Sequence, residues 1–207
     1  MPRTGKNNGV QDQAVRRSLL IGATRLFAQK GYAATSVREI VAESGVTKPT
    51  LYYYFGSKEG IYLELMGSTF ARFRELLETS RRKQGTVRDR LLDLADNLIS
   101  MFAQDMDIAR MMHRMYYSPP QGAPFFDFDA FHHRLMETIQ DLISEGIKTG
   151  ELRGGVPLDM TWAILGALHV VWEAQICHPD IAPGRDGLLR ILGLIFQGIS
   201  AHHDGES

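Results

Sequence analysis

Cysteine is nearly absent from this sequence, whose 207 residues include only Cys177. One cysteine excludes an intrachain disulfide, which favours a reducing compartment and a cytoplasmic protein. No run of about 18 apolar residues occurs, so we expect no membrane-spanning helix. The first residues, MPRTGKNNGVQDQ, lack the apolar stretch of a secretory signal, and we expect residues 1–12 to form a flexible polar arm.

Catalytic signatures are also missing. The sequence contains no HExxH, GxSxG, GxGxxG or phosphate-loop pattern, and no Glu-x-x-His pair of a di-iron bundle. The histidine doublets at 132–133 and 202–203 lack metal-site spacing, because adjacent residues on a helix point about 100° apart. We therefore expect no enzyme, no metal site and no cofactor.

The formal net charge of −1 hides an uneven distribution of charge. Residues 1–60 carry nine Lys or Arg against four Asp or Glu, whereas the remainder carries 14 basic and 20 acidic residues. A basic N-terminal segment on an acidic body is typical of proteins that orient themselves on DNA. A solvated charged face would give the same pattern, so charge alone does not decide between them.

Helical periodicity runs through the chain and no strand pattern occurs, which predicts an all-α fold of about nine helices. Two short helices are expected within residues 36–55, and the others over residues 13–30, 57–82, 87–104, 106–117, 126–149, 158–177 and 185–202. No proline or linker composition interrupts 57–82. We therefore expect a head (13–60) and a helical body (61–203), joined by one long helix.

The segment TSVREIVAESGVTKPTLYYYFGSK, residues 35–58, contains the most specific pattern. Ser36 and Glu39 fit a capping box, and Gly45 suits the left-handed turn after a helix. Pro49 is tolerated in the first turn of the next helix, which Thr47 would cap. This order of helix, tight turn and short helix is typical of a helix-turn-helix, whose second helix reads DNA. A helical hairpin inside an ordinary bundle is the alternative.

The polar residues of this segment are candidates for DNA binding, because hydroxyl groups and cations contact phosphates and base edges. The candidates are Ser36, Arg38, Thr47, Lys48, Pro49, Thr50, Tyr52, Tyr53, Tyr54 and Lys58.

The same segment closely resembles the DNA-binding domain of the tetracycline-repressor (TetR) family. The resemblance covers roughly residues 15–65 and rests on Leu26-Phe27-Ala28, Lys30-Gly31-Tyr32, Thr35, Ile40, Val41, Gly45, Val46, Thr47, Leu51, Tyr52, Phe55, Ser57, Lys58 and Glu59. It implies that Arg38, Lys48, Pro49 and Tyr52 face bases, and that Thr50, Tyr53, Tyr54 and Lys58 face phosphates. Tyr54 is a departure, since many members have His there.

The last two predicted helices are apolar on more than one face, which indicates either the core of one subunit or a subunit interface. We favour the interface, since little of the chain remains to cover these helices. The resemblance implies a homodimer through these helices, bound to a palindromic double-stranded operator and controlled by a small-molecule effector. In such a switch, the effector shifts helices 106–117 and 126–149 and swings helix 57–82, so the heads no longer match the operator.

Methionine and aromatic residues cluster in the body, where they indicate either a plain core or a ligand pocket. The pocket candidates are Phe102, Met111, Met112, His113, Met115, Tyr116, Phe126, Phe131, His132, Trp162, His169, Trp172 and Glu173. Few cations lie nearby, so we expect a neutral, apolar or aromatic effector. Two other functions stay open: a small-molecule-binding protein with little DNA affinity, and an all-α enzyme with an unrecognised site.

Overall fold

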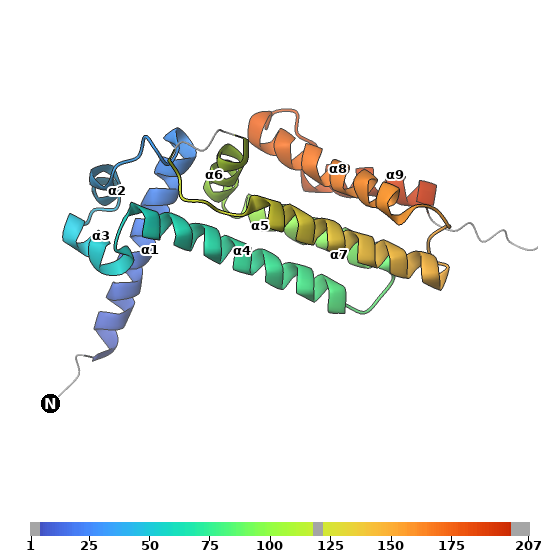
Figure 1. Cartoon of the computed structure of the whole chain (residues 1–207), viewed down its shortest axis with the longest axis horizontal. Coiled ribbons are helices and arrows are strands. Elements are labelled where there is room, and N and C mark those ends of the chain that lie inside the picture. Colours follow the sequence, from blue (N-terminus) through green and yellow to red (C-terminus); the bar gives the residue numbers. More distant parts are fainter. Residues whose placement is uncertain (1–4, 118–121, 200–207) are drawn as a thin grey trace, which may run out of the picture. The chain divides into compact units, whose positions relative to one another are not determined.

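The computed structural model describes residues 5–117 and 122–199, and these residues form nine α-helices and no β-strand (Figure 1). The predicted all-α fold of about nine helices is confirmed. The helices are α1 (Gly5–Lys30), α2 (Val37–Glu43), α3 (Lys48–Phe55), α4 (Lys58–Arg82), α5 (Val87–Ala103), α6 (Met106–Tyr117), α7 (Phe128–Thr149), α8 (Pro157–Cys177) and α9 (Gly184–Ile199).

These helices form two compact units. Unit 1 contains α1, α2, α3, the first half of α4, and α6. Unit 2 contains the rest of α4 together with α5, α7, α8 and α9. Because α6 is grouped with the helix-turn-helix segment, the units do not coincide with the predicted boundary after residue 60. The head and body therefore remain predictions about function.

Unit 1 is built on α1, which packs against α2 and α6. Leu19, Ala23 and Phe27 recur every four residues along α1 and are fully buried. The Phe27 ring meets the ring of Tyr62 on α4 edge to face, with 6.3 Å between the ring centroids. This contact holds the start of α4 on α1, so the helix-turn-helix has a rigid base.

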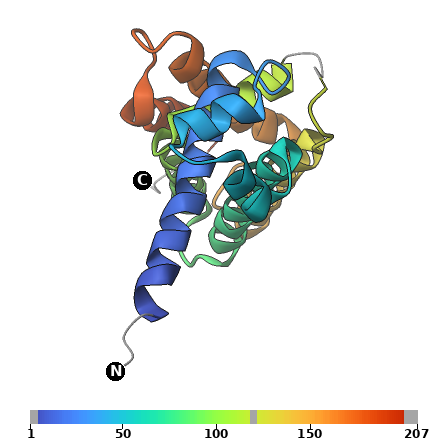
Figure 2. The ribbon, with the colours of Figure 1, turned by 90° about the vertical axis from the view of Figure 1, so that its left-hand side faces the viewer.

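The first helix begins earlier than predicted. It starts at Gly5 rather than near residue 13, and its first turns extend beyond α2 and α3 (Figures 1 and 2). The expectation of a flexible arm over residues 1–12 was therefore wrong for residues 5–12. Asn7, Asn8 and Gly9 favour an arm by propensity, but a side-chain hydrogen bond from Tyr54 fixes Asp12. The predicted end of the last helix, at 200–202, lies outside the described residues.

Unit 2 is a packed set of helices in which α7 contacts α8, α8 contacts α9, and α5 contacts both α7 and α9. Its core includes Leu94, Ile143, Leu192 and Phe196, none more than 1% exposed. The Glu151 carboxylate accepts hydrogen bonds from the backbone N–H groups of residues 87 and 88, at 2.7 and 2.9 Å. It thereby satisfies donors at the α5 N-terminus that have no partner within the helix.

In the described part of the chain, α8 is the one helix that is long and apolar enough to cross a membrane. That finding rests on length and composition, which core and interface helices of soluble proteins share. It is weak evidence for a membrane span.

Candidate DNA-binding surface

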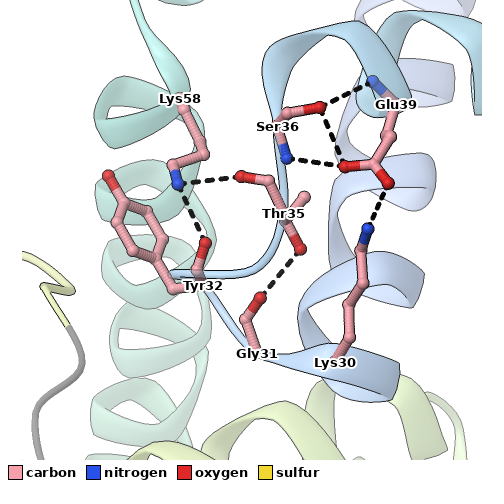
Figure 3. A network of polar contacts seen from close by, with 7 residues as sticks. All are labelled: Lys30, Gly31, Tyr32, Thr35, Ser36, Glu39 and Lys58. Carbon is pink, nitrogen blue, oxygen red and sulfur yellow. Dashed lines mark hydrogen bonds and ion pairs between the residues drawn. The ribbon is translucent and has the colours of Figure 1, made fainter.

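The first turn of α2 is held by a network of polar contacts centred on Glu39 (Figure 3). The predicted capping box is present: the Glu39 N–H donates to Ser36 Oγ at 3.3 Å, and the Ser36 N–H donates to Glu39 Oε2 at 2.9 Å. Lys30, at the end of α1, pairs with the same carboxylate. The Lys30 contact, followed by the Ser36 contacts, lowers the pKa of Glu39 to about 2. These interactions fix α2 against the end of α1.

The Ser36 hydroxyl also donates to Glu39 Oε2 at 2.8 Å. Its proton is therefore committed to the cap, and its predicted contact with DNA stays a prediction.

Lys58 is half-buried, and its ammonium group points toward the loop between α1 and α2 (Figure 3). Its Nζ donates to the carbonyl oxygens of Tyr32 and Thr35, both at 2.8 Å, and lies 4.0 Å from the centroid of the Tyr32 ring. Burial lowers the pKa of this ammonium. The predicted phosphate contact of Lys58 disagrees with this geometry, because two of its three N–H groups are bound to the protein.

At the turn between α2 and α3, Gly45 and Pro49 adopt the predicted positions, whereas the predicted side-chain cap from Thr47 is absent. Gly45 has a φ of +66°, the left-handed conformation that was expected there. Pro49 lies in the first turn of α3. Thr47 occupies the N-cap position, but its hydroxyl bonds the Thr50 hydroxyl at 2.9 Å and caps no backbone N–H. Leu51 is fully buried and anchors α3 in the unit.

The junction between α3 and α4 is tight. The backbone N–H of Gly60 donates to Ser57 Oγ at 3.0 Å, as expected for a helix cap. A Cβ atom at Gly60 would lie 1.9 Å from the carbonyl oxygen of Phe55. The close approach of the two helix ends therefore requires glycine at residue 60.

The free face of α2 and α3 presents the remaining candidates to solvent. Arg38, Lys48 and Pro49 are exposed, and the Tyr52 and Tyr53 side chains are 50% and 80% exposed. In the described part of the chain, Arg38 and Lys48 make no ion pair. These two exposed cations and two exposed phenol rings belong to the same pair of helices and are groups that can contact phosphates and base edges.

The Tyr54 hydroxyl, in contrast, already has a hydrogen-bond partner within the protein. It donates to the carboxylate of Asp12 on α1, and this hydrogen bond raises the pKa of Tyr54 to about 12. Sequence reasoning missed Asp12, because no local pattern relates residues 42 positions apart.

Two arginines of unit 1 were also missed. The Arg16 guanidinium lies 5.3 Å from the centroid of the Phe55 ring and pairs with Glu64 on α4. Arg114 on α6 donates to the carbonyl oxygens of residues 28 and 29, at 3.2 and 2.6 Å. Arg114 thus caps the C-terminus of α1, where a cation is favoured by the helix dipole.

The predicted effector residues are divided between the two units. In unit 1, Met111 and Met112 are buried, His113 and Met115 are half-buried, and Tyr116 is exposed. Phe126 meets Phe70 edge to face, at 5.9 Å between centroids.

In unit 2, three predicted residues come together around Trp172. Its ring centroid lies 5.8 Å from that of Phe102 and 6.2 Å from that of His169, while Glu173 is half-buried. Elsewhere in unit 2, the ring centroids of His132 and the 52% exposed Trp162 are 6.3 Å apart. Phe131 stacks on Phe73 with 3.6 Å between the ring centroids. These contacts are compatible with a core or with a pocket wall, so the pocket stays a prediction.

Residues 19–65 match the family model described as "Bacterial regulatory proteins, tetR family". The matched segment contains the capping box, the turn and the exposed face described above. This matched segment belongs to the TetR family of bacterial regulatory proteins.

Individual relatives and solved structures are similar over longer parts of the chain. YdgC of Bacillus subtilis, an uncharacterized HTH-type transcriptional regulator, is 32% identical over 110 residues, covering 51% of this chain and 55% of that protein. The transcriptional repressor AcnR of Corynebacterium glutamicum is 23% identical over 87% of this chain and 89% of its own length. SmeT of Stenotrophomonas maltophilia, solved with triclosan, superposes with a TM-score of 0.72 at 17% identity, covering 93% of both chains.

Proposed function

We propose that the protein is a ligand-responsive transcriptional repressor that binds a palindromic DNA operator as a homodimer. A small, largely apolar or aromatic effector releases it from the operator. In this proposal the protein works in the cytoplasm, in keeping with its single cysteine.

The observation that carries the DNA-binding proposal is the exposed face of α2 and α3. Arg38 and Lys48 are exposed there and make no ion pair in the described part of the chain. Arginine binds the O6 and N7 atoms of guanine in a bidentate manner, so Arg38 is our candidate for base reading. Lys48, at the start of α3, is the candidate cation for phosphate, while Tyr52 and Tyr53 supply hydroxyl groups.

The homodimer is proposed to form through α8 and α9. Leu158, Trp162 and Val170 are exposed on α8 at 41%, 52% and 63%, and they follow one helical stripe that also contains Gly166. Leu194 on α9 is 68% exposed. A stripe of exposed apolar side chains on two neighbouring helices is suited to a second copy of the same surface. Such a two-fold dimer would present two recognition helices to a palindrome.

The effector proposal draws on the aromatic cluster of unit 2. Phe102, His169 and Trp172 cluster within unit 2, and aromatic side chains with a few polar groups are typical of small-molecule sites. SmeT, whose complex contains triclosan, is a relative by fold. By linkage, the effector must bind more tightly to the conformation that cannot bind the operator. Because α4 contributes to both units, it is the candidate element for coupling them.

Selection of bound duplexes from a random DNA pool tests this function. The purified full chain should enrich a palindrome whose half-sites are about one helical turn, roughly 34–36 Å, apart. The matched control is the double variant Arg38→Ala/Lys48→Ala, which alters only exposed side chains and should show no enrichment at the same protein concentration. The consensus duplex then serves as the probe for effectors that release the protein.

The alternatives give different results. Folded wild-type protein that enriches no duplex, even at low salt, would contradict the repressor proposal. Small-molecule binding without DNA affinity would then indicate a ligand-binding protein, and turnover of a bound compound would indicate an enzyme.

A further inference from the structure

A hydrogen bond joins the first helix of the protein to the candidate recognition helix. The Tyr54 hydroxyl on α3 donates to Asp12 Oδ1 on α1. Because α1 begins at Gly5, about two helical turns precede Asp12. The carboxylate is therefore presented by a helix and not by a mobile arm, and it can act as a fixed anchor for Tyr54.

This bond limits what Tyr54 can do on DNA. A tyrosine has one hydroxyl proton to donate, and a phosphate oxygen only accepts hydrogen bonds. While Tyr54 donates to Asp12, it cannot donate to a phosphate. A tyrosine hydroxyl is protonated at neutral pH, and the hydrogen bond to Asp12 raises its pKa further, to about 12. A phosphate that took the place of Asp12 would also lie next to an uncompensated carboxylate.

Tyr54 in turn supports Tyr53, which is 80% exposed on the candidate DNA-binding face. The two ring centroids are 5.0 Å apart, with an angle of 79° between the ring planes. This edge-to-face geometry is a favourable arrangement of aromatic rings. When the hydrogen bond to Asp12 fixes Tyr54, the Tyr54 ring packs against one side of the Tyr53 ring. This contact restricts the orientations of the Tyr53 side chain.

We propose that Asp12 is a positioning residue for operator recognition, which acts through the Tyr54 hydroxyl on the orientation of Tyr53. This inference rests on the proposed function and deepens it, and it replaces the phosphate contact predicted for Tyr54. The first turns of α1 then belong to the functional head, although Asp12 itself touches no DNA.

The test compares affinity for the selected operator with affinity for a random duplex of the same length. Asp12→Ala and Tyr54→Phe should each lower the operator-to-random ratio roughly three- to tenfold, the effect of losing one hydrogen bond. The double variant should lower the ratio no further, because both substitutions remove the same interaction. Both Asp12→Ala and Asp12→Asn remove a negative charge, so binding to random DNA should strengthen slightly for each.

The Asp12→Asn variant removes the negative charge but keeps a hydrogen-bond acceptor at the same position. Its amide oxygen still accepts from Tyr54, so it should restore the ratio that Asp12→Ala loses. Gln13→Ala, at the exposed neighbouring position of α1, is the control and should keep the wild-type ratio. Thermal melting of each variant shows whether a lower ratio reflects a damaged fold.

Two outcomes would overturn the inference alone. One is an operator-to-random ratio that Asp12→Ala raises or leaves unchanged, as expected if Asp12 only competes with phosphate for Tyr54. The other is additive losses in the double variant. If the wild-type protein itself prefers no duplex, the proposed function fails and this inference fails with it.

Discussion

The Lys58 ammonium lies 4.0 Å from the centroid of the Tyr32 ring and donates to the Tyr32 carbonyl oxygen at 2.8 Å. A second hydrogen bond, to the Thr35 carbonyl, is equally short. Together these contacts tie the start of α4 to the loop between α1 and α2. Lys58, which the sequence suggested as a phosphate contact, therefore stabilises the packing of α4 against the loop before α2.

Replacing Lys58 should affect stability more than DNA binding. Lys58→Met keeps the length of the side chain but loses two charged hydrogen bonds and the contact with the ring. We expect the free energy of unfolding to fall by roughly 1–2 kcal/mol. The slope of log affinity against log salt concentration should be unchanged for the folded variant.

Lys48→Met is the matched control, because Lys48 is an exposed lysine at the start of the neighbouring helix. It should leave the free energy of unfolding unchanged and lower the salt slope by about one, as expected for one lost phosphate contact. The reverse pattern in the two variants would return Lys58 to the phosphate contacts.

Arg38 should determine sequence preference. Arg38→Ala should weaken operator binding by about 1–3 kcal/mol and relax selection at one base position of each half-site. Selection from a random DNA pool checks the lost position. Arg88→Ala, which removes an exposed arginine of α5, has the same change in charge and should keep the consensus. Equal losses on all sequences would instead make Arg38 a phosphate contact.

The features that the sequence predicted well are local. The Ser36–Glu39 capping box and the left-handed Gly45 depend on residues within one turn, so their residue types alone indicate the backbone conformation. The contacts of Asp12 with Tyr54 and of Lys58 with Tyr32 were not predictable, because they join residues 42 and 26 positions apart. Such contacts depend on how helices pack, and one sequence carries no periodic signal for them.

The depressed pKa of Glu39 predicts a specific loss of stability in acid. Its folded-state pKa is about 2, below the ordinary glutamate pKa of 4.5, so its contribution to stability is fully present above about pH 4.5 and is lost as pH falls toward 2. Glu39→Gln retains a capping-box residue but cannot pair with Lys30 as an anion. Urea unfolding should therefore show a larger loss for wild type than for the variant between about pH 5 and pH 3.

The charge control for this experiment is Glu75→Gln, since Glu75 is an exposed carboxylate of α4 outside the Glu39 network. It should follow the wild-type pH profile. Parallel profiles for wild type and Glu39→Gln would mean that the Lys30 and Ser36 contacts add no pH-dependent stability.

Two glycines of α4 should respond to alanine in opposite directions. At Gly60 the added Cβ would meet the Phe55 carbonyl oxygen at 1.9 Å, and two helix ends would have to separate. We expect Gly60→Ala to lower the free energy of unfolding by about 3 kcal/mol. At Gly67 no atom lies within 4 Å of an added Cβ, so Gly67→Ala should raise it by about 0.5–1 kcal/mol through helix propensity. Urea denaturation measures both, and a stabilising Gly60→Ala would contradict the tight junction.

Gly166 offers a test of the proposed dimer that separates folding from association. Within one chain, no atom lies within 4 Å of a Cβ built at Gly166, which is on the same stripe of α8 as the exposed Trp162 and Val170. Alanine there should strengthen the isolated helix, as at Gly67. If two copies of α8 approach closely at this glycine, however, the added methyl group should weaken the dimer by about 1–3 kcal/mol.

Sedimentation equilibrium of wild type, Gly166→Ala and Gly67→Ala distinguishes these effects. We expect a wild-type dimer without DNA, a higher dissociation constant for Gly166→Ala, and the wild-type constant for Gly67→Ala. A wild-type monomer at micromolar concentration would contradict the homodimer. A dimer that Gly166→Ala leaves unchanged would instead place the interface away from this part of α8, because the substitution adds atoms only to a surface that the single chain leaves open.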